Sequence, residues 1–370
     1  MAEKLNLDLL KRLCETPGIP GREERVRELI ISEVEELFDE AWVDALGNLI
    51  CRRLPRKQGT SKGKKTLQVV DAEKAETDAT RLMLASHMDE IGFYVSHIDD
   101  NGFVRLNPAG GFDTRNLFSR RVLVCTTKGD FKGVMNPGGR PIHISSPEDR
   151  NKVPEVKEFF VDLGMTASKV KSTVRVGDMV VLDEPMEVMG EKVVSKALDN
   201  RFACWVAIEA VRAIHESGKP HACDLFVAFT VQEEVGLRGA KVAANSVQPD
   251  FGIGLDVSLS CDTPGVPKEE SVTKQGEGVG LHVMDGSFIS DHEMIDELEA
   301  LAKKNRIKYQ RTILARGGQD GAALQQAMSG ARAAGLVCGT RYIHTVTEMI
   351  DQRDLAAARD LLAAYIPTVK

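Results

Sequence analysis

Short apolar runs alternate with longer amphipathic segments over much of the chain. Residues 225–231 (LFVAFTV) form an apolar run rich in β-branched and aromatic side chains, which predicts a buried strand. Similar strand-like runs occur at residues 82–85, 251–255 and 334–338. Apolar residues recur at helical spacing in four other segments, residues 22–37, 202–215, 291–304 and 354–365. This alternation predicts an α/β fold, with helices on both faces of a mixed sheet.

The pattern changes between residues 93 and 186. Short β-like segments broken by glycines and turns replace the strand–helix alternation, for example at residues 103–106, 121–127, 131–135 and 179–184. Residues 147–160 form a charged excursion, helical or loop, inside this region. We therefore predict a small β-barrel-like domain, residues 93–186, inserted into a catalytic domain made of residues 1–92 and 187–370.

Most of the predicted strands lead directly into residues able to bind metal ions. These residues are His87, Glu233, Glu234, Asp256 and His344. Ligands of open α/β sheets bind at the carboxyl ends of the strands, so these side chains are expected to meet at one sheet edge. Each has an ordinary explanation alone, such as a hydrogen-bonded structural histidine or a solvated loop acid. Their joint placement favours a metal site.

A further acid, Asp199, stands just before the predicted helix at residues 202–215, where it could also serve as a helix cap. With one of the two adjacent glutamates counted as a ligand, the set holds two imidazoles and three carboxylates without cysteine, which suits zinc, cobalt or manganese. One open catalytic zinc needs only three protein ligands. Two ions sharing a bridging carboxylate would use all five, leaving either Glu233 or Glu234 as general base. The sequence alone does not order that adjacent pair.

These motifs carry a resemblance to a known family. The stretches HMDEIGF (residues 87–93), ALDNR (197–201), QEEVGLRGA (232–240), LDVS (255–258) and RYIHT (341–345) resemble the M42 family. This family comprises the dinuclear-metal aminopeptidases that include the TET peptidases and glutamyl aminopeptidases. Residues 14–29 and 44–50 match it as well, so the resemblance covers nearly the whole chain.

The resemblance implies a specific role for each candidate residue. Asp199 would bridge two divalent ions, zinc or cobalt first and manganese as an alternative. His87 and Asp256 would complete one ion site, and Glu234 and His344 the other. Glu233 would be the general base, and Asp89 would orient His87. The implied activity is the removal of N-terminal residues from short peptides by a metal-activated water.

The resemblance also bears on assembly and on the substrate pocket. It implies that the inserted domain forms dimers, which build a dodecamer, although a β-rich insert could equally act as a lid. Gln319 departs from the family, which more often has threonine at this position near the pocket, so a side-chain preference is not carried over. Asp320 is either a helix N-terminal acid or a substrate contact.

Two alternative functions stay open at this point. A glycoside hydrolase needs two carboxylates around the scissile bond, and Glu233 could be one of them. However, the chain is only 5% aromatic with two tryptophans, and the histidines would have no role. An inactive scaffold of the same fold is the other alternative, and the intact ligand set argues against it.

Composition narrows the partners and the compartment. The net charge of −7, with no basic cluster to offset it, argues against nucleic acid and anionic membranes. The basic run at residues 52–65 is interpreted as a solvated loop without an assigned function. Seven cysteines without CxxC spacing predict buried free thiols and a cytoplasmic protein. His97, His143, His282 and His292 are expected to be structural or surface residues, although residues 282–291 could shape the pocket.

Overall fold

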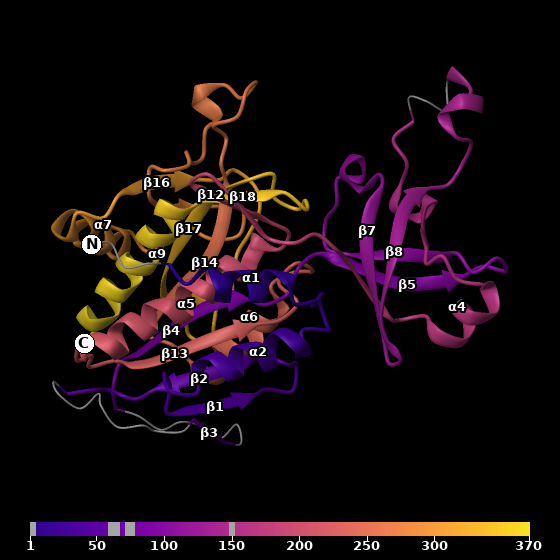
Figure 1. Cartoon of the computed structure of the whole chain (residues 1–370). Helices are drawn as coiled ribbons and strands as arrows, with labels where there is room; N and C mark the ends of the chain where they lie inside the picture. The colour runs from indigo at the N-terminus through magenta and orange to yellow at the C-terminus, as the bar shows by residue number, and fades with distance from the viewer. Residues whose placement is uncertain (1–4, 58–66, 71–77, 148–151) are drawn as a thin grey trace.

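The computed structural model describes residues 5–57, 67–70, 78–147 and 152–370. A large sheet covered by helices forms the main body, and a smaller barrel stands beside it (Figure 1). The predicted fold class is thereby confirmed. The domain boundaries at residues 93 and 186 stay a prediction.

The sheet of the main body contains twelve strands within the described residues. They are β1 (Glu40–Val43), β2 (Leu49–Arg53), β3 (Gln68–Val69), β4 (Arg81–His87), β11 (Glu187–Met189), β12 (Lys192–Ser195), β13 (Asp224–Thr230), β14 (Phe251–Leu259), β15 (Val279–Met284), β16 (Tyr309–Ile313), β17 (Arg332–Arg341) and β18 (Glu348–Asp351). The main path runs β11-β12-β18-β17-β14-β4-β13-β2-β1-β3, with β15 paired to β17 and β16 paired to β15. The four central strands, β13, β4, β14 and β17, are parallel, so their carboxyl ends share one edge.

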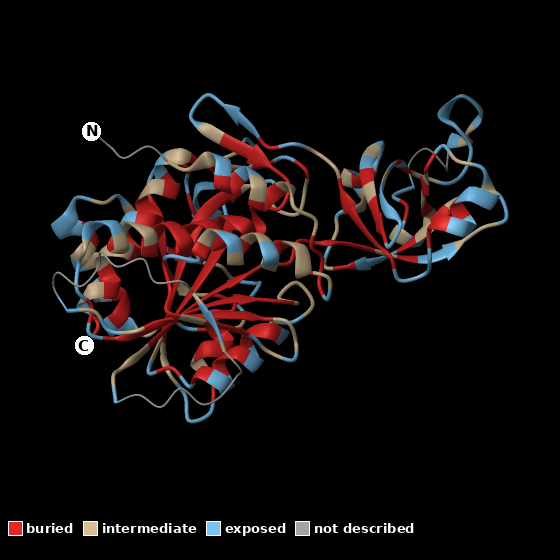
Figure 2. Cartoon of the chain, turned by 60° about the horizontal axis from the view of Figure 1, so that its bottom comes forward, coloured by how far each residue is buried: buried red, intermediate tan, exposed pale blue. Residues whose placement is uncertain are grey.

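Helices cover both faces of this sheet. One face carries α1 (Leu7–Glu15), α2 (Glu24–Val34), α5 (Leu198–Ser217), α7 (His292–Asn305) and α9 (Gln352–Tyr365). The other carries α6 (Arg238–Val247) and α8 (Gly321–Gln325). Successive strand side chains point to opposite faces, so Leu84 joins the first core and Met83 the second. The fully apolar run of each central strand is explained by this burial on both sides (Figure 2).

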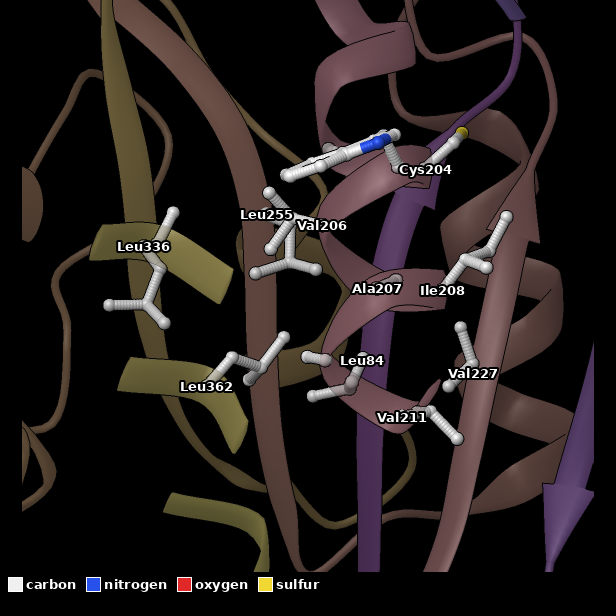
Figure 3. Close-up of a cluster of buried hydrophobic side chains, with 14 of the residues drawn as sticks. Leu84, Cys204, Val206, Ala207, Ile208, Val211, Val227, Leu255, Leu336 and Leu362 are labelled. Atoms are coloured by element: carbon white, nitrogen blue, oxygen red, sulfur yellow. The ribbon is translucent and has the colours of Figure 1, made fainter. Parts of the chain in front are cut away.

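Helix α5 is fixed against the central strands by its apolar face. Val206, Ile208 and Val211 belong to the same buried cluster as Leu84 and Val227 of the strands beneath (Figure 3). This packing is tight enough that all of these side chains are inaccessible to water. The position of the first turn of α5 over the sheet edge therefore follows from the hydrophobic core.

The barrel is built from six strands that close on themselves in the order β10-β5-β6-β9-β8-β7. They are β5 (Gly92–Ile98), β6 (Val104–Ala109), β7 (Arg120–Thr126), β8 (Gly129–Pro137), β9 (Phe159–Asp162) and β10 (Met179–Leu182), and α4 (Ala167–Thr173) packs beside them. The end of the predicted excursion at residues 147–160 lies in strand β9. Val346, from the loop after β17, is buried in the barrel core and ties the two bodies together.

The basic run at residues 52–65 does not begin as a solvated loop. Arg52 and Arg53 end strand β2 and are buried. The Arg52 guanidinium is paired with the buried Asp224 at 2.7 Å, and Arg53 donates to the backbone carbonyl of Leu37. Residues 58–65 of this run lie outside the described residues. In the described part of the chain, no helix combines the length and the apolar character needed to cross a membrane.

Candidate metal centre

The parallel strands bring the candidate residues to one edge. Strands β4 and β13 pair in register so that His87 lies beside Thr230, three residues before Glu233. Asp256 lies on β14, and His344 follows the end of β17 by three residues. The start of α5 adds Asp199 from above the same edge. Together with Glu233 and Glu234 these side chains line a cavity of about 620 Å³.

Asp199 stands between the two histidines. Its Oδ1 lies 3.3 Å from His87 Nε2, and its Oδ2 lies 3.3 Å from His344 Nε2. Asp199 lies in the first turn of α5, where the helical backbone is interrupted at Asp199 and Asn200. Both of its carboxylate oxygens are directed at imidazoles rather than at helix amides.

The remaining acids surround the same two imidazoles. Glu234 Oε2 lies 3.3 Å from His344 Nε2, whereas Glu233 Oε2 lies 3.7 Å and Asp256 Oδ1 4.0 Å from His87 Nε2. Two groups of ligand atoms lie mutually within 4.8 Å, namely His87 with Glu233 and Asp256, and His87 with Asp199 and Glu234. Both adjacent glutamates therefore reach the site, and the geometry does not assign base and ligand between them.

Burial and charge set the protonation of this cluster. Burial lowers the pKa of His344, but hydrogen bonds to Asp199 and Glu234 outweigh it and raise that pKa to about 11. Burial raises the pKa of Glu233 and of Asp256, with His87 opposing the rise in each case. For Asp199, the two imidazoles outweigh burial and lower its pKa. Buried acids crowded in this way are stable as anions only beside positive charge.

The donor set fits divalent cations. Two imidazole nitrogens and several carboxylate oxygens are the ligands that zinc, cobalt and manganese prefer. Glu234 Oε1 is buried and has no hydrogen-bond partner among the described residues. A buried carboxylate oxygen without a partner is costly, and a cation would satisfy it.

Asp89 supports the site differently from the expectation. The backbone carbonyl oxygen of Asp89 lies 3.0 Å from His87 Nδ1, which is hydrogen-bond distance. The carboxylate oxygen Oδ1 of Asp89 lies farther from that nitrogen, at 3.6 Å. The carboxylate instead accepts the backbone N–H groups of Glu233 and Glu234, each at 3.1 Å. Asp89 therefore holds three site residues, one through its carbonyl and two through its side chain.

Several supporting residues were not predicted from the sequence. Asn48 Oδ1 accepts Val231 N–H at 2.9 Å, and Glu23 Oε1 accepts Gln232 N–H at 3.0 Å. Gln232 has a left-handed backbone at φ 56°, which such bonds help to hold. Glu348 accepts the backbone N–H groups of Asp199 and His344. Glu23 and Asn48 lie within the family-like stretches 14–29 and 44–50, but no pattern marks their contacts, because their partners are backbone amides distant in sequence.

Gln319 lies differently from what the sequence indicated. Arg316, Gly317 and Gly318 line the cavity, but Gln319 turns away and is buried against Gly254 and Gly335, where any Cβ would clash with it. Gln319 is therefore a packing residue.

Asp320 is also buried, and it occupies the N-cap position of α8, as expected for a helix N-terminal acid. Its side chain accepts the Thr230 hydroxyl rather than a helix amide, and it does not line the cavity. Burial raises the pKa of Asp320 to about 6.

The other histidines lie outside the cavity lining. His97 and His143 are exposed on the barrel side, and His292 is exposed at the start of α7. His282 is buried and contacts Thr312 Oγ1 at 3.1 Å and Asp285 Oδ2 at 3.2 Å. These four positions agree with structural or surface roles.

Comparisons with known proteins identify the family. A family model described as M42 glutamyl aminopeptidase matches residues 68–361. An aminopeptidase from the archaeon Desulfurococcus kamchatkensis has the same fold with a TM-score of 0.87 and 33% identity, over 98% of this chain and 94% of that one. The TET1 peptidase of Pyrococcus horikoshii, described as assembling into a tetrahedron or a large octahedral shell, gives a TM-score of 0.81 at 29% identity, over 97% and 98% of the chains.

One similar structure carries a different name. A Thermotoga maritima protein called an endoglucanase matches with a TM-score of 0.74 and 27% identity, over 97% of this chain and 96% of that one. Its name agrees with the glycosidase alternative, whereas the family model and the more similar structures are aminopeptidases. The chain belongs to the M42 glutamyl aminopeptidase family and is a peptide hydrolase.

Proposed function

We propose that this protein is a metal-dependent aminopeptidase that removes N-terminal residues from short peptides with the help of two divalent ions. The observation that carries the proposal is Asp199, whose two oxygens each lie 3.3 Å from a different imidazole. A carboxylate in that position is suited to bridge two cations. When bound, these ions supply electrophilic activation of the scissile carbonyl and of the attacking water.

We assign the ligands on this basis. His87 and Asp256 would hold one ion, Glu234 and His344 the other, and Asp199 both. The assignment is supported by the distances around each imidazole and by the buried, unpartnered Glu234 Oε1. Zinc, cobalt and manganese all suit this donor set.

Glu233 is then the general base. Its carboxylate lies on the cavity side of the cluster, 3.7 Å from His87 Nε2, with a side chain 12% exposed. From there it takes a proton from the attacking water and delivers it to the leaving amine. Asp89 keeps Glu233 in place through the hydrogen bond to its backbone N–H. The order within the adjacent pair follows the family resemblance.

A substrate panel tests this function. Aminoacyl chromogenic substrates with acidic, basic and aliphatic side chains, each with a free or a blocked N-terminus, are incubated with chelator-treated protein and with added zinc, cobalt or manganese. We expect cleavage only of free N-termini and only with added metal. Full activity of the stripped protein would refute the metal requirement. Cleavage of β-glucan without peptide hydrolysis would favour the glycosidase alternative.

Glu233→Gln separates a working enzyme from an inactive scaffold. This variant keeps the size of the side chain but cannot accept a proton, so it should bind metal normally and lose turnover by at least about 100-fold. Unchanged turnover in Glu233→Gln would remove the base assignment.

We also propose that the barrel forms dimers that assemble into a larger shell. Ile142, Ile144 and Phe118 of the barrel segment are 63%, 68% and 43% exposed, and contact with a second copy would bury them. The Pyrococcus relative is described as assembling into a tetrahedron or a large octahedral shell. Sedimentation equilibrium tests this assembly, because a protein that stays monomeric at micromolar concentration would exclude it.

The free thiols of all seven cysteines support a cytoplasmic location.

A further inference from the structure

Glu348 holds two distant parts of the candidate site together. It begins strand β18 and is only 2% exposed. Its Oε2 accepts the backbone N–H of Asp199 at 2.9 Å, and its Oε1 accepts the backbone N–H of His344 at 2.8 Å. Among the described residues, no Lys, Arg or His lies within ion-pair distance of it. Both oxygens of a buried carboxylate are thus used on the main chain of two site residues.

The two amides belong to residues whose backbone is irregular. His344 has a left-handed conformation at φ 65°, which costs free energy for a side chain of this kind. Asp199, at φ −80° and ψ 103°, and its neighbour Asn200 interrupt the helical backbone of the α5 segment. Glu348 supplies a hydrogen-bond acceptor to the backbone N–H of both Asp199 and His344.

A second buried carboxylate of the site is used in the same way. The carboxylate of Asp89 accepts the backbone N–H groups of Glu233 and Glu234. Two buried carboxylates, Asp89 and Glu348, thus fix four functional residues through their main chain. Glu348 itself does not line the cavity and so does not reach the substrate.

We propose that Glu348 is a positioning residue that sets the separation of Asp199 and His344, and with it the affinity of the site for a divalent ion. This inference rests on the proposed function. Asp199 Oδ2 and His344 Nε2 are 3.3 Å apart, and the Glu348 carboxylate connects the backbones of these two residues. Residues that orient metal ligands without binding the ion commonly change metal affinity by about 10- to 100-fold when replaced.

The chain offers a matched control. Asp354, at the start of α9, is also buried and also spends both oxygens on backbone amides, those of Gly276 and Gly278, each at 2.7 Å. It does not line the cavity. Asp354→Asn therefore makes the same chemical change as Glu348→Gln without touching the site. In both variants one carboxylate oxygen is replaced by the NH2 of a side-chain amide, which faces a backbone N–H donor and cannot accept its hydrogen bond.

The test is calorimetric titration of metal-free wild type, Glu348→Gln and Asp354→Asn with Zn²⁺ or Co²⁺. We expect Glu348→Gln to bind the metal ion at least about 10-fold more weakly than wild type. The variant should show a lower kcat with a smaller change in KM. Its visible spectrum when saturated with Co²⁺ should differ from that of wild type. Asp354→Asn should lower the melting temperature but keep wild-type affinity and spectrum. Should Glu348→Gln not fold, Glu348→Asp, which keeps the charge but shortens the reach, takes its place with the same expectation.

The outcomes distinguish this proposal from the function on which it rests. Wild-type affinity and spectrum in a folded Glu348 variant would overturn the positioning role. So would an equal loss of affinity in Asp354→Asn, because that would reflect general destabilisation. If wild type itself bound neither ion, the proposed metalloenzyme function would fail instead.

Discussion

At the scale of single residues, Asp199 occupies a position that no other described acid shares. One of its oxygens is directed at His87 and the other at His344, although these histidines lie 257 positions apart in the sequence. The other acids of the cluster approach one imidazole more closely than the other. This asymmetry makes the contribution of Asp199 to metal binding different in kind from that of Asp256.

Asp199→Asn is therefore expected to be more damaging than Asp256→Asn. Asp199→Asn removes the negative charge of a carboxylate shared by both proposed ions. Asp256→Asn removes a carboxylate that contacts only one of them. Bound metal measured by mass spectrometry of digested protein should fall toward none in Asp199→Asn and by about half in Asp256→Asn, with turnover following. Equal metal loss in the two variants would contradict the bridging role.

Arg316 leads to a prediction about substrate preference. Arg316 is the only arginine or lysine among the described residues that line the cavity, whose other walls include Leu259, Leu314 and Ile343. A guanidinium there would attract an acidic first side chain, and an exposed pair of this kind is worth up to about 1 kcal/mol. Arg316→Ala should therefore lower kcat/KM for a glutamyl substrate by up to about fivefold, with a leucyl substrate unchanged as internal control. A parallel loss on both substrates would indicate a general effect on the loop.

At the scale of elements, the beginnings of helices decide where several side chains are held. Asp291 caps α7 by accepting Met294 N–H at 3.0 Å, and it also pairs with Arg332 on the neighbouring strand at 2.9 Å. One carboxylate thus joins a helix to the sheet. Arg332 lowers the pKa of Asp291 to about 2.

Asp291→Asn should destabilise the protein in a pH-dependent way. Asparagine still caps the helix, so the loss is that of the ion pair, about 0.5–1 kcal/mol. The folded pKa lies below the unfolded value of about 3.9, so the stabilisation is present above pH 4 and disappears as the pH falls toward 2. Urea unfolding of both proteins should show a difference at pH 7 that shrinks by pH 3. If the difference in unfolding free energy between the two proteins stayed constant with pH, the loss would come from the helix cap rather than from the ion pair.

At the scale of the whole molecule, the proposed ligands come from segments spread between residues 87 and 344. Ions bound to them would link the strand edge, the start of α5 and the loop whose Val346 is buried in the barrel core. Binding to the folded state alone stabilises it by about 2.7 kcal/mol at 100 times the dissociation constant.

Added zinc, cobalt or manganese should accordingly raise the melting temperature of the chelator-treated protein by several degrees. His344→Ala should show a much smaller rise, because it lacks one proposed ligand from the loop that reaches the barrel. Differential scanning calorimetry measures both, with calcium as a control ion that the imidazoles do not favour. An equal rise in melting temperature in wild type and His344→Ala would show that the metal stabilises the protein by binding elsewhere.

The amino-acid sequence by itself determined the four central strands and the helices at residues 22–37, 202–215, 291–304 and 354–365, and it placed His87, Glu233, Asp256 and His344 at or near the carboxyl ends of strands. This works because local periodicity reports burial, and the carboxyl ends of parallel strands must meet at one edge. The strand runs at residues 82–85, 225–231, 251–255 and 334–338 are found in β4, β13, β14 and β17. The predicted burial of the cysteines is found at six of the seven positions, and Cys261 is half-buried.

Only the tertiary structure decided how these residues are supported. Glu348 acts on amides that belong to another strand end and another helix, and Gln319 fills a gap above two glycines of neighbouring strands. Arg52 looked like part of a solvated loop, but it is paired with Asp224 across the sheet. Contacts of this kind leave no pattern along the chain, because the partner is chosen by packing in three dimensions rather than by spacing in sequence.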